Sequence, residues 1–340
     1  MYIIATVGPN IMDKKVLKDI FYSGANSLRF NFSHGNSKEF LEYIEMAKAI
    51  KEDVVIILDL CGSKIRVSNK LFGICRIYNE EKVYFCGEDK YKQVNQKLKN
   101  NNKIVPLNIN NNVLMENNYD EISIKDNTMI FNILGKEEGF LKADTVRGGV
   151  IRAGKGCNIK GFDRSKIKLN LKDKEDIKFG IEHKVDIICQ SFVESDECIN
   201  EIIEFIDLNK KEDYNPKIWA KIETLEGIKN IDKIVSKVGG IMVGRGDLIA
   251  ETSIEDTPIY EEFIIKRVKE YTDDKEIIIA THILDNMKSG KMPCISEVES
   301  IYNFIKNGVD GFLLAGETSI GRAPIKTVKF LKDLIEKYEG

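Results

Sequence analysis

The chain contains 340 residues, and its 51 lysine and arginine residues nearly balance its 54 aspartate and glutamate residues, which leaves a formal net charge of −3. This balance argues against a nucleic-acid coat protein or a membrane-surface protein, and no window approaches the roughly 18 uninterrupted apolar residues of a membrane span. The seven cysteines include no CxxC pair, and the opening MYIIATVGPN lacks the basic start and apolar run of a secretion signal, so we predict a cytoplasmic protein with reduced thiols.

Eight short apolar runs predict buried strands. They cover residues 3–7, 27–32, 54–60, 186–192, 218–223, 240–244, 277–281 and 311–315. Most are separated by segments such as KEFLEYIEMAKAIKED and SEVESIYNFIKNG, whose three-and-four apolar spacing is typical of amphipathic helices. Strands that alternate with helices favour a parallel sheet, and eight such units favour a closed barrel over an open sheet. We therefore predict an α/β protein with a (β/α)8 TIM barrel.

One segment after the third strand does not follow this alternation. It contains short β-like pieces such as KVYFCG and GFLKADTV, separated by asparagine and glycine turns. We predict a small β-barrel lid domain over residues 67–153, inserted into a barrel domain made of residues 1–66 and 154–340. Within the insertion, the asparagine-rich run KLKNNNKIVPLNINNNV is expected to be a solvated loop.

The ends of the predicted strands carry polar groups, and in a TIM barrel these ends form the active site. Each could instead simply cap the following helix. The ends read TVGPN, RFNFSHG, DLCGSK, SFVES, KIET, GRGD, THILD and AGET. Because eight polar ends should converge on one mouth of the barrel, we expect a functional site there.

Two of these ends predict a divalent metal site. Glu223 and Asp247 follow consecutive strands, and two carboxylates side by side suit Mg²⁺ or Mn²⁺. Lys221 should lie on the same face of its strand as Glu223, either as a simple salt-bridge partner or as a ligand for a phosphate or enolate. Gly246 and its neighbours would add backbone N–H groups for an anion. Further cations are expected at the rim or on the inserted domain: Arg29, Lys64, Arg66 and Lys155.

The motifs resemble those of the pyruvate kinase family, in the family's order and at about its spacing. They are TVGPN, RFNFSHG, LDLCGSKIR, GKGCNIKG, SFVES, KIETLEGIKNID, IMVGRGDL, IIIATHILDNM and DGFLLAGETSIG, and they extend over nearly the whole chain. The resemblance implies a barrel with an inserted β lid, and phosphoryl transfer between phosphoenolpyruvate and ADP to give pyruvate and ATP. Both substrate pairs are expected as partners, nucleic acid and membranes are not, and a homo-oligomer is compatible with the sequence.

The resemblance also implies roles for residues at matching positions. Glu223 and Asp247 would bind Mg²⁺ or Mn²⁺. Lys221 would steady the transferring phosphoryl group, with Arg29 as a second phosphate contact. Thr281 would lie next to the enolate carbon and help to deliver the proton through water.

Three further groups of residues follow from the same resemblance. The substrate would contact Ser191 and the N–H groups near Gly246 and Asp247, in addition to Arg29, Lys221 and Thr281. A monovalent-cation site would comprise Asn31, Ser33 and Asp59. The nucleotide would contact Arg66, Lys155, Asn31 and His34.

Lys64 bears on the need for potassium. Family members that need K⁺ typically have glutamate at the position of Lys64, whereas those that do not typically have lysine. We therefore predict that the Lys64 ammonium replaces the cation, oriented by Asp59, that it acts in catalysis, and that K⁺ is not required. A surface lysine paired with a nearby acid is the alternative.

The chain also departs from the family pattern. Cys61 and Ile320 stand where lysine is usual, Ala315 replaces serine, His282 replaces glutamine, and MPCISE replaces PTRAE. The Cys61, Ala315 and Ile320 changes weaken the nucleotide and proton-relay sides, MPCISE is expected to disturb a helix of the usual subunit contact, and the substrate and metal side is nearly intact. We also expect no C-terminal regulatory domain. The alternatives are therefore a metal-dependent enolate enzyme without nucleotide, such as an oxaloacetate decarboxylase or aldolase, and a weakly active sensor of phosphoenolpyruvate or pyruvate.

Overall fold

The computed structural model describes residues 1–33, 35, 37–98, 102–125, 127–164, 167–211, 214–272 and 274–339. The chain forms two compact units. The barrel unit comprises Met1–Ser63, Lys168–Leu248 and Glu255–Gly340, and the β unit comprises Lys64–Ile167 and Ile249–Ile254.

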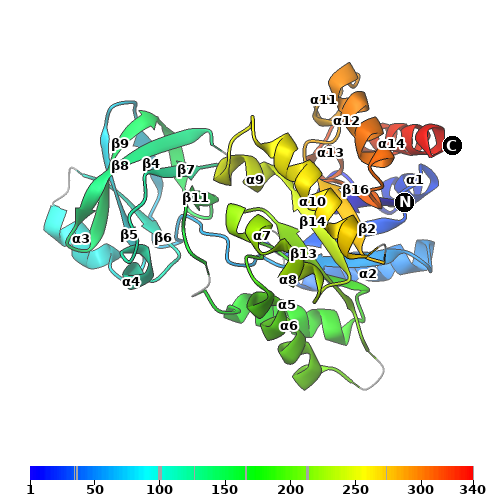
Figure 1. Cartoon of the computed structure of the whole chain (residues 1–340), viewed down its shortest axis with the longest axis horizontal. Helices are drawn as coiled ribbons and strands as arrows, with labels where there is room; N and C mark the ends of the chain where they lie inside the picture. The colour runs from blue at the N-terminus through cyan, green and yellow to red at the C-terminus, as the bar shows by residue number, and fades with distance from the viewer. Residues whose placement is uncertain are drawn as a thin grey trace. The chain divides into compact units, whose positions relative to one another are not determined.

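The eight predicted buried runs form a closed parallel barrel, which confirms the predicted fold class (Figure 1). In spatial order around the barrel, the strands are β1 (Tyr2–Thr6), β2 (Ser27–Asn31), β3 (Val55–Asp59), β12 (Ile187–Gln190), β13 (Lys217–Ile222), β14 (Gly240–Gly244), β15 (Glu276–Ala280) and β16 (Gly311–Leu314). The strand ends differ from the predicted ones by at most two residues, because the apolar runs coincide with the residues that the barrel buries.

Helices follow the barrel strands as the periodicity predicts. The longer ones are α1 (Lys14–Tyr22), α2 (Ser37–Ile50), α5 (Leu171–Glu182), α6 (Asp196–Asn209), α10 (Thr257–Tyr271), α12 (Ile295–Lys306) and α14 (Pro324–Tyr338). The shorter ones are α7 (Leu225–Lys229), α8 (Ile231–Val235), α9 (Arg245–Glu251), α11 (Asp285–Lys288) and α13 (Gly316–Ser319). None of the helices in the described part of the chain has the length and apolar character needed to cross a membrane.

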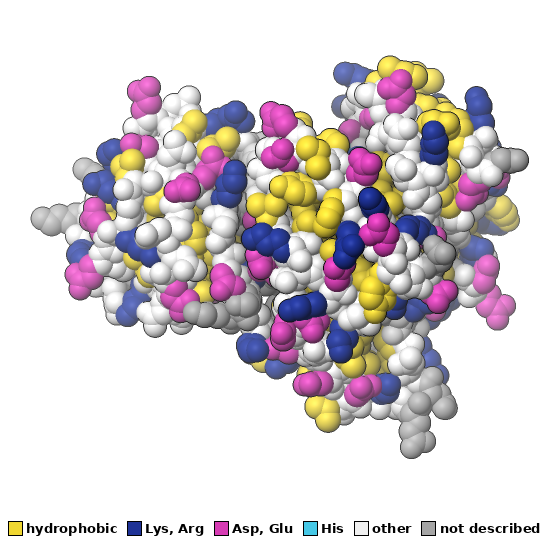
Figure 2. Space-filling model, viewed as in Figure 1, with side chains coloured by type: hydrophobic (Ala, Val, Ile, Leu, Met, Phe, Trp, Pro, Cys, Tyr) yellow, Lys and Arg dark blue, Asp and Glu magenta, His cyan; other side chains and the backbone are white. Residues whose placement is uncertain are grey.

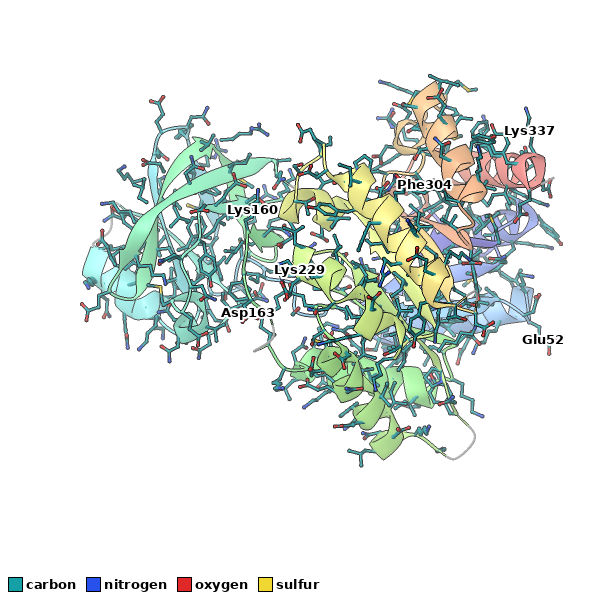
Figure 3. All side chains as sticks on the ribbon, in the orientation of Figure 1. Glu52, Lys160, Asp163, Lys229, Phe304 and Lys337 are labelled. Carbon is teal, nitrogen blue, oxygen red and sulfur yellow. The ribbon has the colours of Figure 1, made fainter. Side chains whose placement is uncertain are left out.

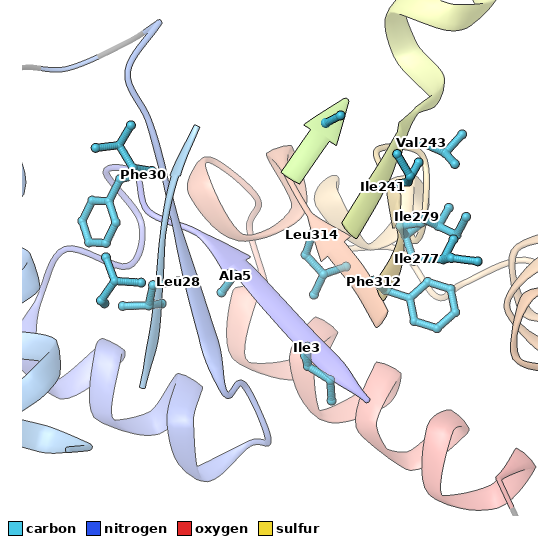
Figure 4. Packing of buried hydrophobic residues seen from close by; sticks show 14 of the residues in the cluster. Ile3, Ala5, Leu28, Phe30, Ile241, Val243, Ile277, Ile279, Phe312 and Leu314 are labelled. Atoms are coloured by element: carbon cyan, nitrogen blue, oxygen red, sulfur yellow. The ribbon is translucent and has the colours of Figure 1, made fainter. Parts of the chain in front are cut away.

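Alternating residues of the barrel strands face two different apolar layers. One layer packs between strands and helices, and Figure 4 shows part of it, including Ile3, Phe30 and Leu314. The other layer fills the barrel interior and includes Ile4, Ile57, Cys189, Trp219, Met242, Ile278 and Leu313. Since side chains alternate with a period of two, the residues two positions beyond this layer also point inward. The sequence places polar residues at several of those positions.

The β unit contains a six-stranded sheet in the order β11-β7-β8-β9-β5-β6 and a two-stranded sheet of β10 and β4. Its elements are β4 (Ile74–Ile77), β5 (Lys82–Gly87), α3 (Tyr91–Leu98), β6 (Lys103–Leu107), α4 (Asn111–Leu114), β7 (Glu121–Ile124), β8 (Met129–Glu137), β9 (Phe140–Arg147), β10 (Gly149–Arg152) and β11 (Cys157–Ile159). The unit is longer than the expected 67–153 because β11 pairs with β7 and because residues 249–254 join it.

The asparagine-rich run is not the simple loop that its composition suggested. Its apolar core KIVPL forms β6, which pairs with β5 in parallel and buries Val105 and Leu107. Pro106 is tolerated there because β6 is an edge strand and needs one ladder hydrogen bond fewer. Residues 99–101 of the run lie outside the described residues.

Charged side chains of both signs are interspersed on the face of the described residues in Figure 2, as the near-zero net charge leads one to expect. No broad single-sign field is visible on that face. Charged groups do gather locally in the barrel interior.

Candidate active site

An inward-facing polar layer lies above the apolar filling of the barrel. Asp59 and Lys221 come two residues after Ile57 and Trp219, which belong to the interior apolar layer. Arg29 lies between the outward-facing Leu28 and Phe30, so it also points into the barrel. The three side chains therefore point into the barrel because of strand periodicity, and the register of β2 with β3 brings Arg29 close to Asp59.

Arg29 and Asp59 form a buried ion pair. The Nε atom and one terminal nitrogen of Arg29 both lie 2.6 Å from Oδ2 of Asp59. The other terminal nitrogen donates to the Thr6 hydroxyl at 3.3 Å. Only 1% of the Asp59 surface is exposed, so this carboxylate is stabilised by its partners and not by water.

Lys221 completes the cluster. Its Nζ atom donates to Ser191 Oγ at 3.0 Å and lies 3.2 Å from Glu223 Oε1 and 3.5 Å from Asp59 Oδ2. Ser191 Oγ in turn lies 3.1 Å from Asp59 Oδ1 and 2.8 Å from the Leu60 carbonyl oxygen. The predicted shared face of Lys221 and Glu223 is thus observed as a direct contact.

The charges in this cluster stabilise one another against burial. Burial alone would raise the pKa of the Asp59 carboxyl, but the Arg29 and Lys221 charges and the hydrogen bonds to this carboxyl outweigh it, and the pKa is lowered. Burial alone would lower the pKa of the Lys221 ammonium, but Asp59 and Glu223 outweigh it, and the pKa is raised. The charged form of Lys221 is therefore favoured in this buried site.

Glu223 is fixed from two sides. Its Oε1 atom faces Lys221, and its Oε2 atom accepts a hydrogen bond from the Phe192 N–H at 2.9 Å. A methyl group on Gly244, at the end of β14, would lie 2.6 Å from Glu223 Cγ, so only glycine leaves room for this carboxylate. Asp247 is in the first turn of α9, which follows β14 directly. The two predicted metal ligands therefore follow adjacent strands.

Thr281 and Gly246 meet at the ends of β15 and β14. The Gly246 N–H donates to Thr281 Oγ1 at 3.0 Å, so this N–H, expected to be available to an anion, is engaged here by a hydroxyl. Thr281 and His282 both have positive φ angles, 67° and 53°, which are uncommon for residues other than glycine and most strained at the β-branched Thr281. Arg245 holds this turn by donating to the Thr281 carbonyl at 2.6 and 3.0 Å and to the His282 carbonyl at 2.5 Å.

Arg245 was not among the predicted site residues. Its guanidinium also lies 5.4 Å from the ring centroid of Phe304, which is labelled in Figure 3, and 3.8 Å from Glu261. The available signal was the arginine of GRGD, but its partners are carbonyl oxygens that only the positive-φ turn presents. Thr6 was missed for a similar reason, because its role depends on the register of β1 with β2.

The loop after β3 is anchored by Asp173 on α5. Asp173 accepts hydrogen bonds from the Cys61 and Gly62 N–H groups at 3.1 and 3.0 Å and from the Asn170 amide at 2.8 Å. Burial and the neighbouring Asp176 raise the pKa of Asp173 to about 6. Ligand atoms of Cys61, Asp173 and Asp176 lie within 4.8 Å of one another. Among the described residues, this is the group of three possible metal ligands whose ligand atoms the fold brings together. The sequence did not predict this group.

The predicted cation and nucleotide residues belong to different units. In the barrel unit, Asn31 pairs in register with Asp59, and Asn31 Oδ1 accepts the Ser33 N–H at 3.0 Å. In the β unit, Arg66 forms an antiparallel bridge with Gly156, beside Lys155. A methyl group on Gly156 would lie 2.9 Å from Lys64 Cε. The fold thus brings Lys64, Arg66 and Lys155 together, whereas His34 lies outside the described residues.

Comparison with known proteins shows the family to which the chain belongs. The family model described as pyruvate kinase, barrel domain, matches residues 1–328. The pyruvate kinase of Clostridium perfringens is 30% identical over 352 residues, which cover 99% of the chain and 70% of that protein. The chain belongs to the pyruvate kinase family. Pyruvate kinases of Staphylococcus epidermidis and Staphylococcus aureus are also 30% identical, over 348 and 343 residues, and the chain spans 57% of the length of each.

The departures from the pyruvate kinase pattern occupy distinct places. Cys61 is half-buried beside Asp173, and Ile320 is 59% exposed at the end of α13. The Ala315 N–H donates to Glu317 Oε2 at 2.9 Å. The segment that replaces PTRAE still begins helix α12, since Glu297 accepts the Cys294 N–H at 2.8 Å. The local fold is therefore kept while the chemistry at Cys61 and Ala315 changes.

Proposed function

We propose that the chain transfers a phosphoryl group between phosphoenolpyruvate and ADP, with pyruvate and ATP as products. The observation that carries the proposal is the buried Lys221 ammonium, held by Asp59, Ser191 and Glu223 at the mouth of the barrel. In a loose phosphoryl-transfer transition state, charge spreads over the peripheral oxygens, so fixed cations provide most of the catalysis. Lys221 and Arg29 would supply that charge, with Ser191 holding Lys221 in place.

Glu223 and Asp247 would hold Mg²⁺ or Mn²⁺. The donor chemistry fits, since both offer hard carboxylate oxygens and Glu223 is oriented by the Phe192 N–H and the Lys221 ammonium. A divalent ion bound there would neutralise charge on the phosphoryl and enolate oxygens. The protein itself would orient the substrate carboxylate at Gly246 and Asp247, where the carboxylate would replace Thr281 Oγ1 as the acceptor of the Gly246 N–H. Thr281 would then lie beside the enolate carbon.

The nucleotide would bind through Arg66 and Lys155 of the β unit, together with Asn31 and His34, and the β unit would act as a lid. The proximity of Lys64 to Gly156, next to Lys155, supports a local positive strip for phosphates. We further propose that K⁺ is not required. Asp59, the acid of the expected cation site, already faces Arg29 and Lys221.

A second candidate is favoured by Cys61, which provides a thiol beside Asp173 where pyruvate kinases usually have a lysine. That change weakens the nucleotide side and leaves the enolate machinery of Lys221, Glu223 and Thr281 unaffected. A metal-dependent decarboxylase or aldolase that acts through an enolate would need only that machinery.

The deciding experiment is a coupled assay with phosphoenolpyruvate, Mg²⁺ and ADP. Pyruvate and ATP formed in equal amounts, at a rate proportional to protein concentration, are the expected result. A protein that does not phosphorylate ADP, but decarboxylates oxaloacetate or releases pyruvate from an aldol substrate, would favour the second candidate. Binding of phosphoenolpyruvate without turnover of any of these would instead indicate a sensor.

A further inference from the structure

His282 and Asp285 form a close pair beside the proposed site. His282 follows Thr281 directly after β15, and its Nδ1 atom lies 2.5 Å from Asp285 Oδ2 on α11. A carboxylate on Nδ1 fixes that nitrogen as a proton donor and leaves Nε2 as the ring atom that can gain or release a proton. The His282 side chain is 50% exposed, so Nε2 can also exchange protons with solvent.

The Nε2 atom borders the same position as Thr281 Oγ1. A methyl group built on Gly246 would lie 3.5 Å from Thr281 Oγ1 and 3.8 Å from His282 Nε2. Gly246 leaves this space open at the first turn of α9, where the substrate carboxylate and enolate carbon are proposed to lie. The Nε2 atom of the imidazole therefore lies beside the proposed reacting part of the site.

The conformation that places the imidazole there is held against strain. Both Thr281 and His282 have positive φ angles, a conformation that costs free energy for residues other than glycine. Arg245 offsets this cost with hydrogen bonds to both carbonyl oxygens. A strained turn fixed by a buried arginine is expected where the direction of a side chain matters for function.

We propose that His282 is a catalytic residue that transfers the proton at the enolate carbon, and that Asp285 is its positioning residue. The inference rests on the proposed function and adds a named proton donor to it. When the enolate is protonated, the Nε2–H bond of the imidazolium breaks and a C–H bond forms on the methylene carbon. The neutral imidazole then takes a proton from water. In reverse, neutral Nε2 removes a proton from the pyruvate methyl group.

The surrounding charges favour this role. The hydrogen bond with Asp285 raises the pKa of His282, against burial and the Arg245 charge, so that more imidazolium is present near neutral pH. The same hydrogen bond lowers the pKa of Asp285. The charged groups that act on the pair come from four helices: Asp285 and Lys288 of α11, Arg245 of α9, Glu261 of α10 and Glu317 of α13.

The test is exchange of the pyruvate methyl protons for deuterium, followed by NMR with Mg²⁺ and inorganic phosphate and without ADP. We expect His282→Gln to slow exchange by roughly 10²–10⁴-fold, the range of a positioned acid–base group. Exchange needs the neutral base, so the wild-type rate should rise with pH through the raised pKa of His282 and then level off. In His282→Gln, this rise of the exchange rate with pH should be absent. In Asp285→Asn, the rise should occur at lower pH.

The chain offers a matched control. His183 caps the end of α5, where its ring contacts Phe179, and His183→Gln should leave both rate and pH profile unchanged. With three histidines in the chain, the two variants also assign the imidazole NMR signals of the metal-free protein. The His282 signal should titrate above the usual histidine pKa, and in Asp285→Asn it should titrate lower.

Each outcome decides a different question. Wild-type exchange without phosphorylation of ADP would refute the kinase proposal and leave the role of His282 standing. Phosphorylation of ADP together with unchanged exchange and pH profile in His282→Gln would overturn the role of His282 alone. Absence of methyl exchange in the wild type, or titration of His282 at or below the usual value, would also overturn it.

Discussion

Lys221 Nζ lies 3.2 Å from Glu223 Oε1, so the proposed phosphate-binding cation and a proposed metal ligand are direct neighbours inside the barrel. The contact follows from their spacing, because residues two apart on one strand share a face. It also means that the ammonium is positioned before substrate arrives, which is the condition for electrostatic stabilisation of a transition state.

Lys221→Met should abolish most of the phosphoryl transfer while leaving the fold and Mn²⁺ binding nearly intact. Loss of a preorganised charge should lower kcat by about 10³-fold or more, and Asp59 keeps its Arg29 partner. A coupled assay and Mn²⁺ titration by electron paramagnetic resonance measure the two effects. Lys229→Met, at an exposed lysine labelled in Figure 3 that pairs with Glu226, is the matched control. A higher KM with unchanged kcat would contradict the role of Lys221.

The sequence predicted that Lys221 and Glu223 share a face, because this depends only on the alternation of side chains along a strand and on the order of the strands. The eight apolar runs and the Lys221–Glu223 face required no knowledge of register. The Arg29–Asp59 pair did require it, since side chains on β2 and β3 meet only once Asn31 is aligned with Asp59. The role of Arg245 was equally hidden, because its partners are carbonyl oxygens of a strained turn that no sequence pattern specifies.

The edge of the β unit was misplaced for a related reason. Its last sheet strand, β11, is the three-residue segment CNI, which is too short to show alternation. Its membership depends on pairing with β7, more than thirty residues earlier in the chain. Short strands of this kind can be identified only when their pairing partners are known. The longer run KVYFCG was predicted correctly to be β-structure, and it forms β5.

The contribution of Asp173 to the stability of the protein should increase as pH falls from about 6 toward 4. Its folded pKa of about 6 lies above the value of 3.8 for an ordinary aspartate, so in this window the folded state binds a proton that the unfolded state does not. The contribution is on the order of 3 kcal/mol. Urea unfolding at pH 4, 5, 6 and 7 measures it. Asp173→Asn should flatten the slope over this window, and an unchanged slope in the variant would show that another group is responsible.

Excision of the β unit should leave a folded barrel that no longer phosphorylates ADP. The eight barrel strands lie outside residues 64–167, and the Asn170 amide lies 3.4 Å from the Gly62 carbonyl, so a short glycine linker can join the ends. Removal of only 67–153 should yield less soluble protein, because Ile159 and Phe162 would lose their apolar cover. Circular dichroism and thermal melting check the fold. An unfolded product of the longer excision would mean that the barrel depends on the β unit.

We predict that Lys64 removes the need for potassium. A glutamate at this position would add negative charge near the phosphates that a bound monovalent cation must offset, whereas lysine supplies the positive charge covalently. At an effective dielectric constant near 20, a unit charge about 4 Å from a phosphate oxygen is worth roughly 4 kcal/mol. The Asp59 carboxylate does not require a further cation, because Arg29 and Lys221 already neutralise its charge. Activity should therefore be independent of K⁺ at constant ionic strength.

Lys64→Glu should lose most of its activity in K⁺-free buffer and regain part of it when K⁺ is added, because the ion then supplies the charge that the substitution removed. Initial rates in K⁺ and in tetramethylammonium, which is too large to enter such a site, measure the effect. Lys160→Glu makes the same charge change at an exposed residue of the β unit, labelled in Figure 3, and should show no K⁺ response. Strong K⁺ activation of the unmodified protein over the tetramethylammonium control would show that Lys64 does not replace the cation.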